Sequence, residues 1–294
     1  KGDIYKVGVN GGEAQQLTSS NSFDSNPIWS PDGQKIAFAS DRFAYGNTDI
    51  LVMSINGGQA TRLTTHSGKE IPCTFTPDGK NVLFSASIQD QATSVLFPTA
   101  KLYSVSVDGG RIQQVLQTPA EAVCFNVDGS YFVYQDKKGG EDEWRKHHTS
   151  SITRDIWVYD ANTKSHKNLT AHAGEDRNPV LSADGKTVFM LSERKGGSFN
   201  VYSFPLDQPN NLSNVTDFKT HPVRFLSISR NGRLCYTYDG EIYTQESAQA
   251  QPKKVNINIT RDDFSPLEHL SFARGVSNAT VSPDGKQVAF VARG

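Results

Sequence analysis

Apolar and polar residues alternate along short segments of this chain, and residues 49–55 show the pattern clearly. Side chains such as Ile50 and Val52 point one way, whereas Leu51 and Met53 point the other way. A period of two over a run of this length predicts a β-strand. The segments that hold the same place in later repeats are residues 101–107, 154–159, 200–204 and 241–244.

A turn signal joins these segments into a longer repeat. In residues 26–40, two apolar runs flank Asp32-Gly33, a dipeptide that readily takes the positive-φ conformations of a tight hairpin turn. The same design returns at Pro77-Asp78-Gly79, Val127-Asp128-Gly129, Ala183-Asp184-Gly185, Arg230-Asn231-Gly232 and Pro283-Asp284-Gly285. The glycines are 46, 50, 56, 47 and 53 residues apart. A period of about 50 residues made of strands and turns is typical of a β-propeller.

Each repeat predicts four strands, and the two ends of the chain complete one another. In the first full repeat the strands are residues 26–30, 35–40, 49–55 and 60–64. The chain finishes on two strands, 279–282 and 287–292, and begins with the missing two, 3–9 and 13–18. We therefore predict an all-β fold, a six-bladed β-propeller with four-stranded blades. Residues 1–294 form one domain, and both termini close the last blade.

The predicted strand directions sort the connections onto two faces of the ring. The Asp-Gly turns and the turns after the third strands, such as Asn56-Gly57-Gly58, fall on one face and are uniformly tight. The long connections fall on the other face, at residues 41–48, 88–100, 136–153, 193–198 and 261–278. Because function collects where irregular loops stand on a rigid scaffold, we expect binding on the long-loop face or at the channel mouth beside it.

Composition narrows the classes of partner. The 294 residues include 30 basic and 31 acidic side chains, for a net charge of −1, and no basic stripe with interleaved aromatic residues occurs. We expect neither nucleic-acid binding nor attraction to an anionic membrane. No apolar run approaches the roughly 18 residues that span a bilayer. Without a secretory leader at Lys1, the sequence is expected to be a mature chain or a domain excised from a longer one.

The cysteines add little to this picture. Cys73, Cys124 and Cys235 all lie inside apolar strand segments, and their number is odd. We expect three buried free thiols rather than a disulfide framework.

The Pro-Asp-Gly repeats resemble those of TolB and of the tricorn-type peptidases. Within the third repeat, residues 137–159 resemble the insertion in the amino-terminal six-bladed propeller of bacterial tricorn protease homologues, most specifically over residues 145–157. The resemblance implies a non-catalytic domain that guides peptides or unfolded polypeptide toward a serine-peptidase core. It also implies PDZ and peptidase domains in the same parent chain, and a periplasmic or cell-envelope location, with the cytoplasm as the alternative.

Catalysis by this chain alone is not expected. The sequence has no Gly-x-Ser-x-Gly elbow, and serines such as Ser30 and Ser282 are explained by their place before a turn. We assign no catalytic residue and no cofactor.

The insertion at residues 136–153 carries the candidate peptide-binding residues. They are Trp144, Arg145, Lys146, His147 and His148. A cationic side chain would pair with a peptide carboxylate, and the tryptophan would offer an apolar platform. The alternative is a solvated loop whose mixed charges pair with each other and whose tryptophan packs on the blade edge.

Three histidines invite a metal hypothesis. His66, His172 and His221 fall in blade-to-blade connections on one predicted face, and the first two hold equivalent positions. They could converge on one ion, with Glu70, Glu175 or Asp176 as further ligands. The alternative is that each histidine makes ordinary hydrogen bonds within its own loop.

Charged residues also gather on these connections, and they predict a polar channel mouth of mixed sign. The acids are Asp24, Glu70, Glu175, Asp176, Asp262, Asp263 and Glu268, and the arginines are Arg177, Arg224, Arg261 and Arg274. Three functions remain open at this point. The first is a substrate-gating domain of a tricorn-like peptidase, the second is a TolB-like module that docks a partner protein, and the third is a metal-dependent propeller lyase.

Overall fold

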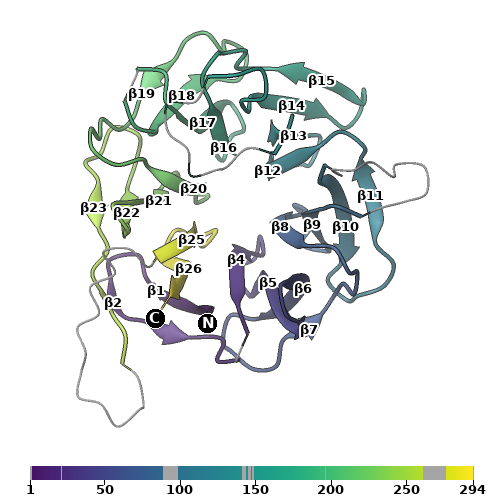
Figure 1. Cartoon of the computed structure of the whole chain (residues 1–294). Helices are drawn as coiled ribbons and strands as arrows, with labels where there is room; N and C mark the ends of the chain where they lie inside the picture. The colour runs from purple at the N-terminus through teal and green to yellow at the C-terminus, as the bar shows by residue number, and fades with distance from the viewer. Residues whose placement is uncertain are drawn as a thin grey trace.

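The computed structural model describes residues 2–20, 22–88, 99–140, 144, 147, 149–195, 197–260 and 276–293. Across these residues the regular structure is entirely β, in six four-stranded sheets arranged around a central axis (Figure 1). The predicted six-bladed β-propeller is confirmed. The described part of the chain contains no helix long and apolar enough to cross a membrane.

Each blade is an antiparallel sheet, and in blades one to five the strands run outward from the axis in sequence order. Blade one consists of β4 (Asp24–Trp29), β5 (Lys35–Ala44), β6 (Asn47–Ser54) and β7 (Thr61–Arg62). Blade two consists of β8 (Glu70–Phe75), β9 (Asn81–Ala86), β10 (Lys101–Ser106) and β11 (Gln113–Leu116). Blade three consists of β12 (Ala120–Phe125), β13 (Tyr131–Asp136), β14 (Ile156–Asp160) and β15 (Ser165–Asn168).

The remaining blades follow the same plan. Blade four consists of β16 (Asp176–Leu181), β17 (Thr187–Ser192), β18 (Asn200–Pro205) and β19 (Ser213–Asn214). Blade five consists of β20 (Arg224–Ile228), β21 (Leu234–Tyr238), β22 (Glu241–Gln245) and β23 (Lys253–Lys254). Blade six consists of β25 (Val276–Val281), β26 (Gln287–Arg293), β1 (Gly2–Gly8) and β3 (Gln15–Gln16).

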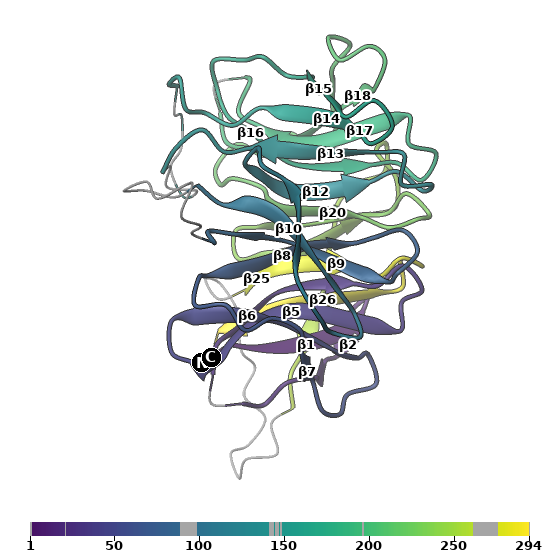
Figure 2. The same ribbon diagram turned by 90° about the vertical axis from the view of Figure 1, so that its right-hand side faces the viewer.

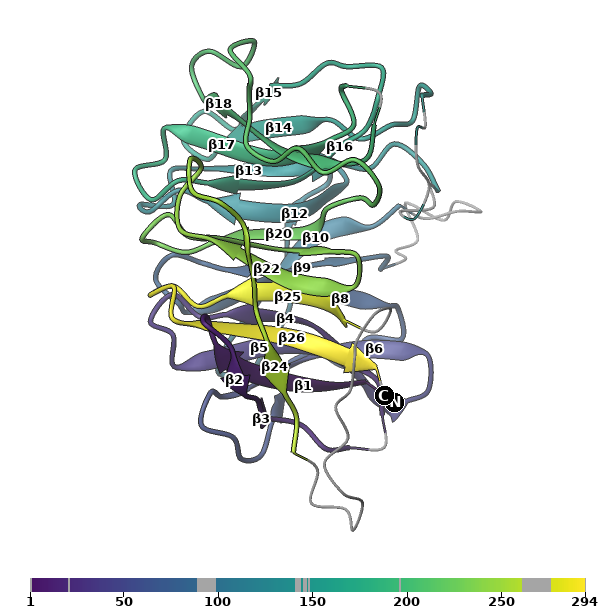
Figure 3. The same ribbon diagram turned by 90° about the vertical axis from the view of Figure 1, so that its left-hand side faces the viewer.

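Both termini close blade six, as the sequence predicts. β1 and β26 pair antiparallel from Gly2 opposite Arg293 to Gly8 opposite Gln287. A second contact reinforces this closure, because β2 (Gly12–Glu13) runs parallel to β24 (Ile257–Asn258) of the chain that leaves blade five. Figures 2 and 3 show the two termini side by side at one edge of the ring.

The core lies between blades rather than inside any one of them. Ile50 and Val52 pack toward blade two with Phe84, whereas Leu51 and Met53 of the same strand pack toward blade six. The alternation in residues 49–55 is therefore confirmed. Since each blade is buried on both faces, a single blade has no stable fold without its neighbours.

The Asp-Gly turns close through a side chain as well as through the backbone. In the first turn Gly33 N–H donates to Ser30 O at 2.9 Å, and Ser30 Oγ donates to Asp32 Oδ1 at 2.6 Å. Of the two central residues we predicted at positive φ, only the glycine takes it, at +71° for Gly33. The aspartate instead accepts hydrogen bonds, so it closes the turn as a polar cap.

We name the face with these turns the turn face and the opposite face the loop face. The third strands also end on the turn face, because Ile55 N–H donates to Gln34 O at 3.0 Å and Val107 N–H donates to Lys80 O at 2.9 Å. The described blade-to-blade connections, the β5–β6 connection and the described part of the β13–β14 connection lie on the loop face, as predicted. Most residues of the predicted connections 88–100 and 261–278 lie outside the described residues. One boundary was wrong. Residues 41–48 were expected to form a loop, but β5 and β6 extend into it and pair as far as Ala44 opposite Asn47.

Every innermost strand carries a bulge near its start. The register against the second strand shifts after Ser25 in β4 and at the matching place in four other blades, and it shifts one residue later, after Pro72, in blade two. The residue at the bulge has φ near +50° in five blades, as Asn26, Ala122, Asn178, Phe225 and Asn278. Pro72 holds the equivalent place in blade two. A bulge re-aims side chains, and here these residues border the central axis.

Candidate functional site: the central channel

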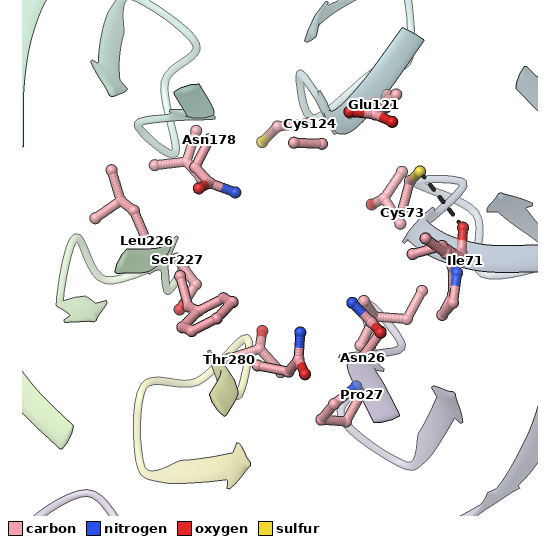
Figure 4. A pocket seen from close by; sticks show the side chains of 18 of the residues that line it. Asn26, Pro27, Ile71, Cys73, Glu121, Cys124, Asn178, Leu226, Ser227 and Thr280 are labelled. Carbon is pink, nitrogen blue, oxygen red and sulfur yellow. Dashed lines mark hydrogen bonds between the residues drawn. The ribbon is translucent and has the colours of Figure 1, made fainter. Parts of the chain in front are cut away.

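The six innermost strands enclose a cavity of about 1240 Å³ on the propeller axis (Figure 4). Its lining includes Tyr45 and Trp144 on the loop face and Pro31 and Val127 on the turn face. The cavity therefore runs as a channel from one face of the ring to the other. Its volume exceeds that of most pockets for small molecules, which span roughly 300–1,000 Å³.

Charge is distributed unevenly along this channel. Among the described residues that line it, the charged ones at the loop-face mouth are Asp41, Lys69, Glu121, Lys137, Arg154, Arg177 and Arg224. Among the described lining residues, Arg230 is the one charged residue at the turn-face mouth. A mouth of mixed sign is present, and Arg177 and Arg224 belong to it. The other predicted mouth residues lie outside the described residues; they are Arg261, Asp262, Asp263, Glu268 and Arg274.

A buried ion network supports this mouth on blades three and four. Arg154 Nη1 lies 2.5 Å from Glu175 Oε1, and Arg177 Nε lies 2.7 Å from the same oxygen. Lys137 Nζ lies 2.7 Å from Glu121 Oε1, and Arg154 Nε lies 3.6 Å from Glu121 Oε2. The side chain of Arg154 is only 4 % exposed. Despite its burial, the two arginines hold the pKa of Glu175 below its ordinary value.

The insertion between β13 and β14 brings an aromatic side chain to the same mouth. Trp144 belongs to blade three but contacts blade five, where Arg224 Cζ lies 4.4 Å from its ring centroid and the Phe225 ring lies 6.4 Å away, edge to face. Its side chain remains 55 % exposed. An exposed indole beside a guanidinium presents an apolar platform next to a positive charge.

The other residues proposed for peptide docking have different positions. The backbone N–H of His147 donates to Glu193 Oε2 at 2.8 Å, so this residue ties the insertion to blade four. Arg145, Lys146 and His148 lie outside the described residues. The structure therefore brings Trp144 to the channel and leaves the docking role of all five residues a hypothesis.

The three histidines do not meet around one point. His66 Nδ1 accepts from Gly68 N–H at 3.0 Å, and His172 Nδ1 accepts from Gly174 N–H at 3.0 Å. His221 Nε2 lies 3.4 Å from Asp239 Oδ1 within blade five. No group of three metal-ligating side chains occurs in the described part of the chain. Each histidine thus has a local partner of the kind that the alternative reading expects.

Three acids that we expected at the channel mouth are instead enclosed within the blades. Asp24 pairs with Arg42 at 3.0 Å, and Asp176 pairs with Arg194 at 2.6 Å. Glu70 accepts a hydrogen bond from Thr64 Oγ1, and burial raises its pKa to about 7. The expectation was wrong because each acid is fully buried with a partner in the fold, and none of the three lines the channel.

The cysteine prediction was half right. All three thiols are free and Cys235 is buried, but Cys73 and Cys124 are only partly buried and line the channel. Burial raises the pKa of Cys73 to about 12 and that of Cys124 to about 11, so both are neutral thiols near pH 7. The Glu121 carboxylate, which also lines the channel, adds to the rise of the pKa at Cys73.

Sequence reasoning missed the asparagines of the channel wall. Asn26, Asn178 and Asn278 sit at the bulge of three inner strands and border the cavity. A usable signal was present, because asparagine is several-fold enriched at positive φ, and Asn26 and Asn178 both precede a proline at the start of a predicted strand. Tyr45, which is 100 % exposed at the tip of the β5–β6 hairpin, was missed as well.

The fold and the channel together define the class: a closed six-bladed β-propeller with an open axis and a charged mouth. A sequence comparison then gives the family, because residues 1–251 match the family described as the tricorn protease N-terminal beta propeller domain. The chain belongs to that family. A comparison with curated proteins gives no match.

Solved structures share the fold at low sequence identity. The putative TolB from Agrobacterium tumefaciens is 17 % identical, with a TM-score of 0.71 over 99 % of this chain and 97 % of that chain. TolB from Acinetobacter baumannii is 19 % identical, with a TM-score of 0.62 over 99 % of this chain and 64 % of that one. The tricorn protease is 21 % identical, with a TM-score of 0.68 over 91 % of this chain and 24 % of that chain. This chain therefore corresponds to about a quarter of the tricorn protease chain.

Proposed function

We propose that this propeller is a non-catalytic domain that admits peptides or unfolded polypeptide to the serine-peptidase core of a tricorn-like parent protein. The observation that carries the proposal is the channel, which is one continuous cavity of about 1240 Å³ lined from both faces of the ring. A folded protein is far too large for such a cavity, whereas an extended chain is narrow. Family membership over residues 1–251 supports the same role.

The loop-face mouth is the proposed entrance. Exposed aromatic side chains stand on this face, with Phe43 at 51 %, Tyr45 at 100 % and Trp144 at 55 % exposure. Apolar side chains of an unfolded polypeptide gain contact area on such rings, and the mixed charges of the mouth engage its polar groups. In this proposal Arg145 and Lys146, which follow Trp144 in the sequence, supply cationic partners for peptide carboxylates, and His147 and His148 come next along the chain.

A TolB-like docking role is the second candidate. It is favoured by the structural match to the Agrobacterium tumefaciens protein, which covers nearly all of both chains. In that role the exposed rings of the loop face would bind a folded partner, and the channel would remain unused. No described histidine cluster supports the third candidate, a metal-dependent lyase.

Peptide hydrolysis separates these functions. The 294-residue chain and the product of the complete reading frame are assayed on an unfolded protein and on a short peptide. We expect only the longer product to cleave. Within it, Trp144→Ser lowers kcat/KM for the unfolded protein about tenfold and leaves the short peptide unaffected. The matched control is Val115→Ser, because Val115 is a partly exposed apolar residue of β11 that does not line the channel.

Other outcomes decide against gating. If neither chain cleaves, or if Trp144→Ser and Val115→Ser behave alike, the gating role is rejected and docking takes its place. Cell fractionation tests the proposed location: recovery with the periplasm or envelope supports it, and recovery with the cytoplasm contradicts it.

A further inference from the structure

The channel wall carries side-chain amides with almost no hydrogen-bond partners among the described residues. Asn26 and Asn178 project into the cavity from blades one and four, on opposite sides of the ring (Figure 4). Neither side-chain amide hydrogen bonds to another described residue. Asn278 of blade six accepts one bond, from Ser277 Oγ at 3.2 Å. We call these three residues the amide belt.

Backbone conformation alone does not account for the belt. Each of the three asparagines has φ near +50°, a region that asparagine tolerates well. However, Ala122 and Phe225 take the same conformation at the equivalent place in blades three and five, with φ of 48° and 55°. The bulge therefore forms without an amide, and the three amide groups are available to a ligand.

Most side chains labelled near the belt are uncharged. Cys73, Cys124, Ser227 and Thr280 line the channel there, and Glu121 is the charged residue among them (Figure 4). Proline at position 72 occupies the equivalent place in blade two without adding a backbone donor. A ligand held at this level is therefore recognised mainly by hydrogen bonds and shape.

We propose that the amide belt binds the main chain of an extended polypeptide, regardless of its side chains. A peptide group offers one N–H donor and one C=O acceptor, and an asparagine amide offers both complements at once. Amides on opposite walls satisfy successive peptide groups that lose water on entering the channel. This inference rests on the proposed passage of polypeptide and specifies its substrate class as unfolded chains of any charge.

The charged mouth and the amide belt then have different roles in binding. The mouth, with Arg177, Arg224 and Trp144, selects which segment enters, because its contacts depend on side chains. The belt holds whatever segment has entered. Variants of the two levels therefore have different effects on ligand selectivity.

The test measures binding of a labelled uncharged peptide of about 20 residues, rich in glycine and serine and blocked at both ends, by fluorescence anisotropy. The triple variant Asn26→Ala, Asn178→Ala, Asn278→Ala installs the residue that blade three already carries at this place. We expect its affinity to be at least tenfold lower, which is less than three average hydrogen bonds would contribute. The second triple variant, with glycine at the same positions, retains the positive φ without strain and is expected to lose affinity equally.

A matched ligand sharpens the test. The same peptide with alternate backbone nitrogens methylated lacks half its N–H donors. We expect it to bind wild-type protein about as weakly as the triple variant binds the unmodified peptide, and the triple variant to discriminate little between the two ligands.

The remaining outcomes separate this proposal from passage itself. If wild-type protein binds the peptide and both triple variants bind it equally well, the amide belt is rejected while passage stands. If wild-type protein binds no polypeptide, both are rejected. Preferential binding of a neutral oligosaccharide of similar length also overturns the inference.

Discussion

The two faces of this ring are built from the same six repeats, yet only one of them repeats itself in detail. On the turn face, adjacent turns touch one another: Tyr131 Oη donates to Gly185 O at 2.8 Å, and Arg230 N–H donates to Pro283 O at 2.9 Å. On the loop face the connections between second and third strands differ in length, although the blade-to-blade connections that hold His66 and His172 contain the same kind of hydrogen bond. The turn face maintains the ring, and the loop face is free to vary.

Ionisation distinguishes the faces as well. The turn aspartates have pKa values lowered chiefly by hydrogen bonds from the side chain two residues before or after them or from nearby backbone N–H groups, as at Asp32 and Asp78. Near the loop face, burial raises the pKa of Glu70 to about 7. Local hydrogen bonds therefore lower the pKa of the turn-face aspartates, whereas desolvation raises the pKa of Glu70 near the loop face.

The largest expected effect concerns the buried network of the loop face. Arg154→Met removes a 2.5 Å ion pair and leaves Glu175 with one arginine fewer. We expect the free energy of unfolding to fall by about 3 kcal/mol, as is typical when one partner of a buried pair is removed. Lys137→Met is the control, because the ion pair of Lys137 with Glu121 is nearer the solvent and should contribute less than about 1 kcal/mol. If urea titrations gave equal losses of unfolding free energy for the two variants, the buried network would contribute no more to stability than the more exposed ion pair.

The second prediction tests closure on the turn face with two equivalent glycines. Gly11 and Gly57 have nearly the same φ, +88° and +89°. A Cβ added at Gly11 would lie 2.3 Å from Asn256 O, whereas a Cβ added at Gly57 would have no described atom within 4 Å. Gly57→Ala should cost about 1 kcal/mol through backbone strain. Gly11→Ala should cost about 2 kcal/mol more, because it also displaces β24 from β2. Thermal unfolding compares them, and equal melting temperatures would mean that this contact does not help to close the ring.

The third prediction is a dependence on pH. The folded protein holds the Glu70 proton up to about pH 7, whereas the unfolded chain releases it above the ordinary value of 4.5. The unfolding free energy due to this group therefore falls as pH rises from 4.5 to 7 and is level above that. The free energy of unfolding of Glu70→Gln, taken relative to wild type, should rise by on the order of 2 kcal/mol as the pH is raised from 5 to 8.

The turn face supplies the opposite control. Because the pKa of Asp78 is lowered, its stabilising effect is present above its ordinary value of 3.8 and is lost as pH falls through the folded value. Asp78→Asn should therefore leave the slope of the unfolding free energy against pH unchanged between pH 5 and pH 8. Melting curves for both variants across that range would contradict the prediction if their slopes matched.

The smallest expected effect concerns the tip of the β5–β6 hairpin. Tyr45 is fully exposed, so Tyr45→Ser should change the unfolding free energy by less than about 0.5 kcal/mol. A larger loss would show that the exposed rings of the loop face support the fold rather than a binding function.

Much of the fold could be read from local patterns. The Asp32-Gly33 signal and its five repeats located every inner hairpin, and the missing strands at the two ends revealed how blade six closes. The length of the β5–β6 hairpin was predicted wrongly, because the strand ends that pair at Ala44 and Asn47 show no apolar alternation in the sequence. Polar strand ends have no periodic signal in the sequence.

The candidate site was only partly predictable. Trp144 was identified from its neighbours in the insertion, but its contact with Arg224 joins residues 80 positions apart. The expectation that Asp24, Glu70 and Asp176 lie at the mouth was wrong, because the sequence gives their position in a strand but not the direction of their side chains. Only the bulge geometry shows which side chains face the axis.

Short-range patterns in the chain specify the number of blades, the closure by the termini and the turn face, because strand alternation and turn hydrogen bonds span only a few residues. The packing of the blades against one another specifies which side chains line the channel. Asn26, Asn178 and Asn278 come from three separate repeats, and they share one cavity only after six blades have packed into a ring. Burial between blades also decided the protonation of Glu70, since desolvation depends on every neighbour that excludes water.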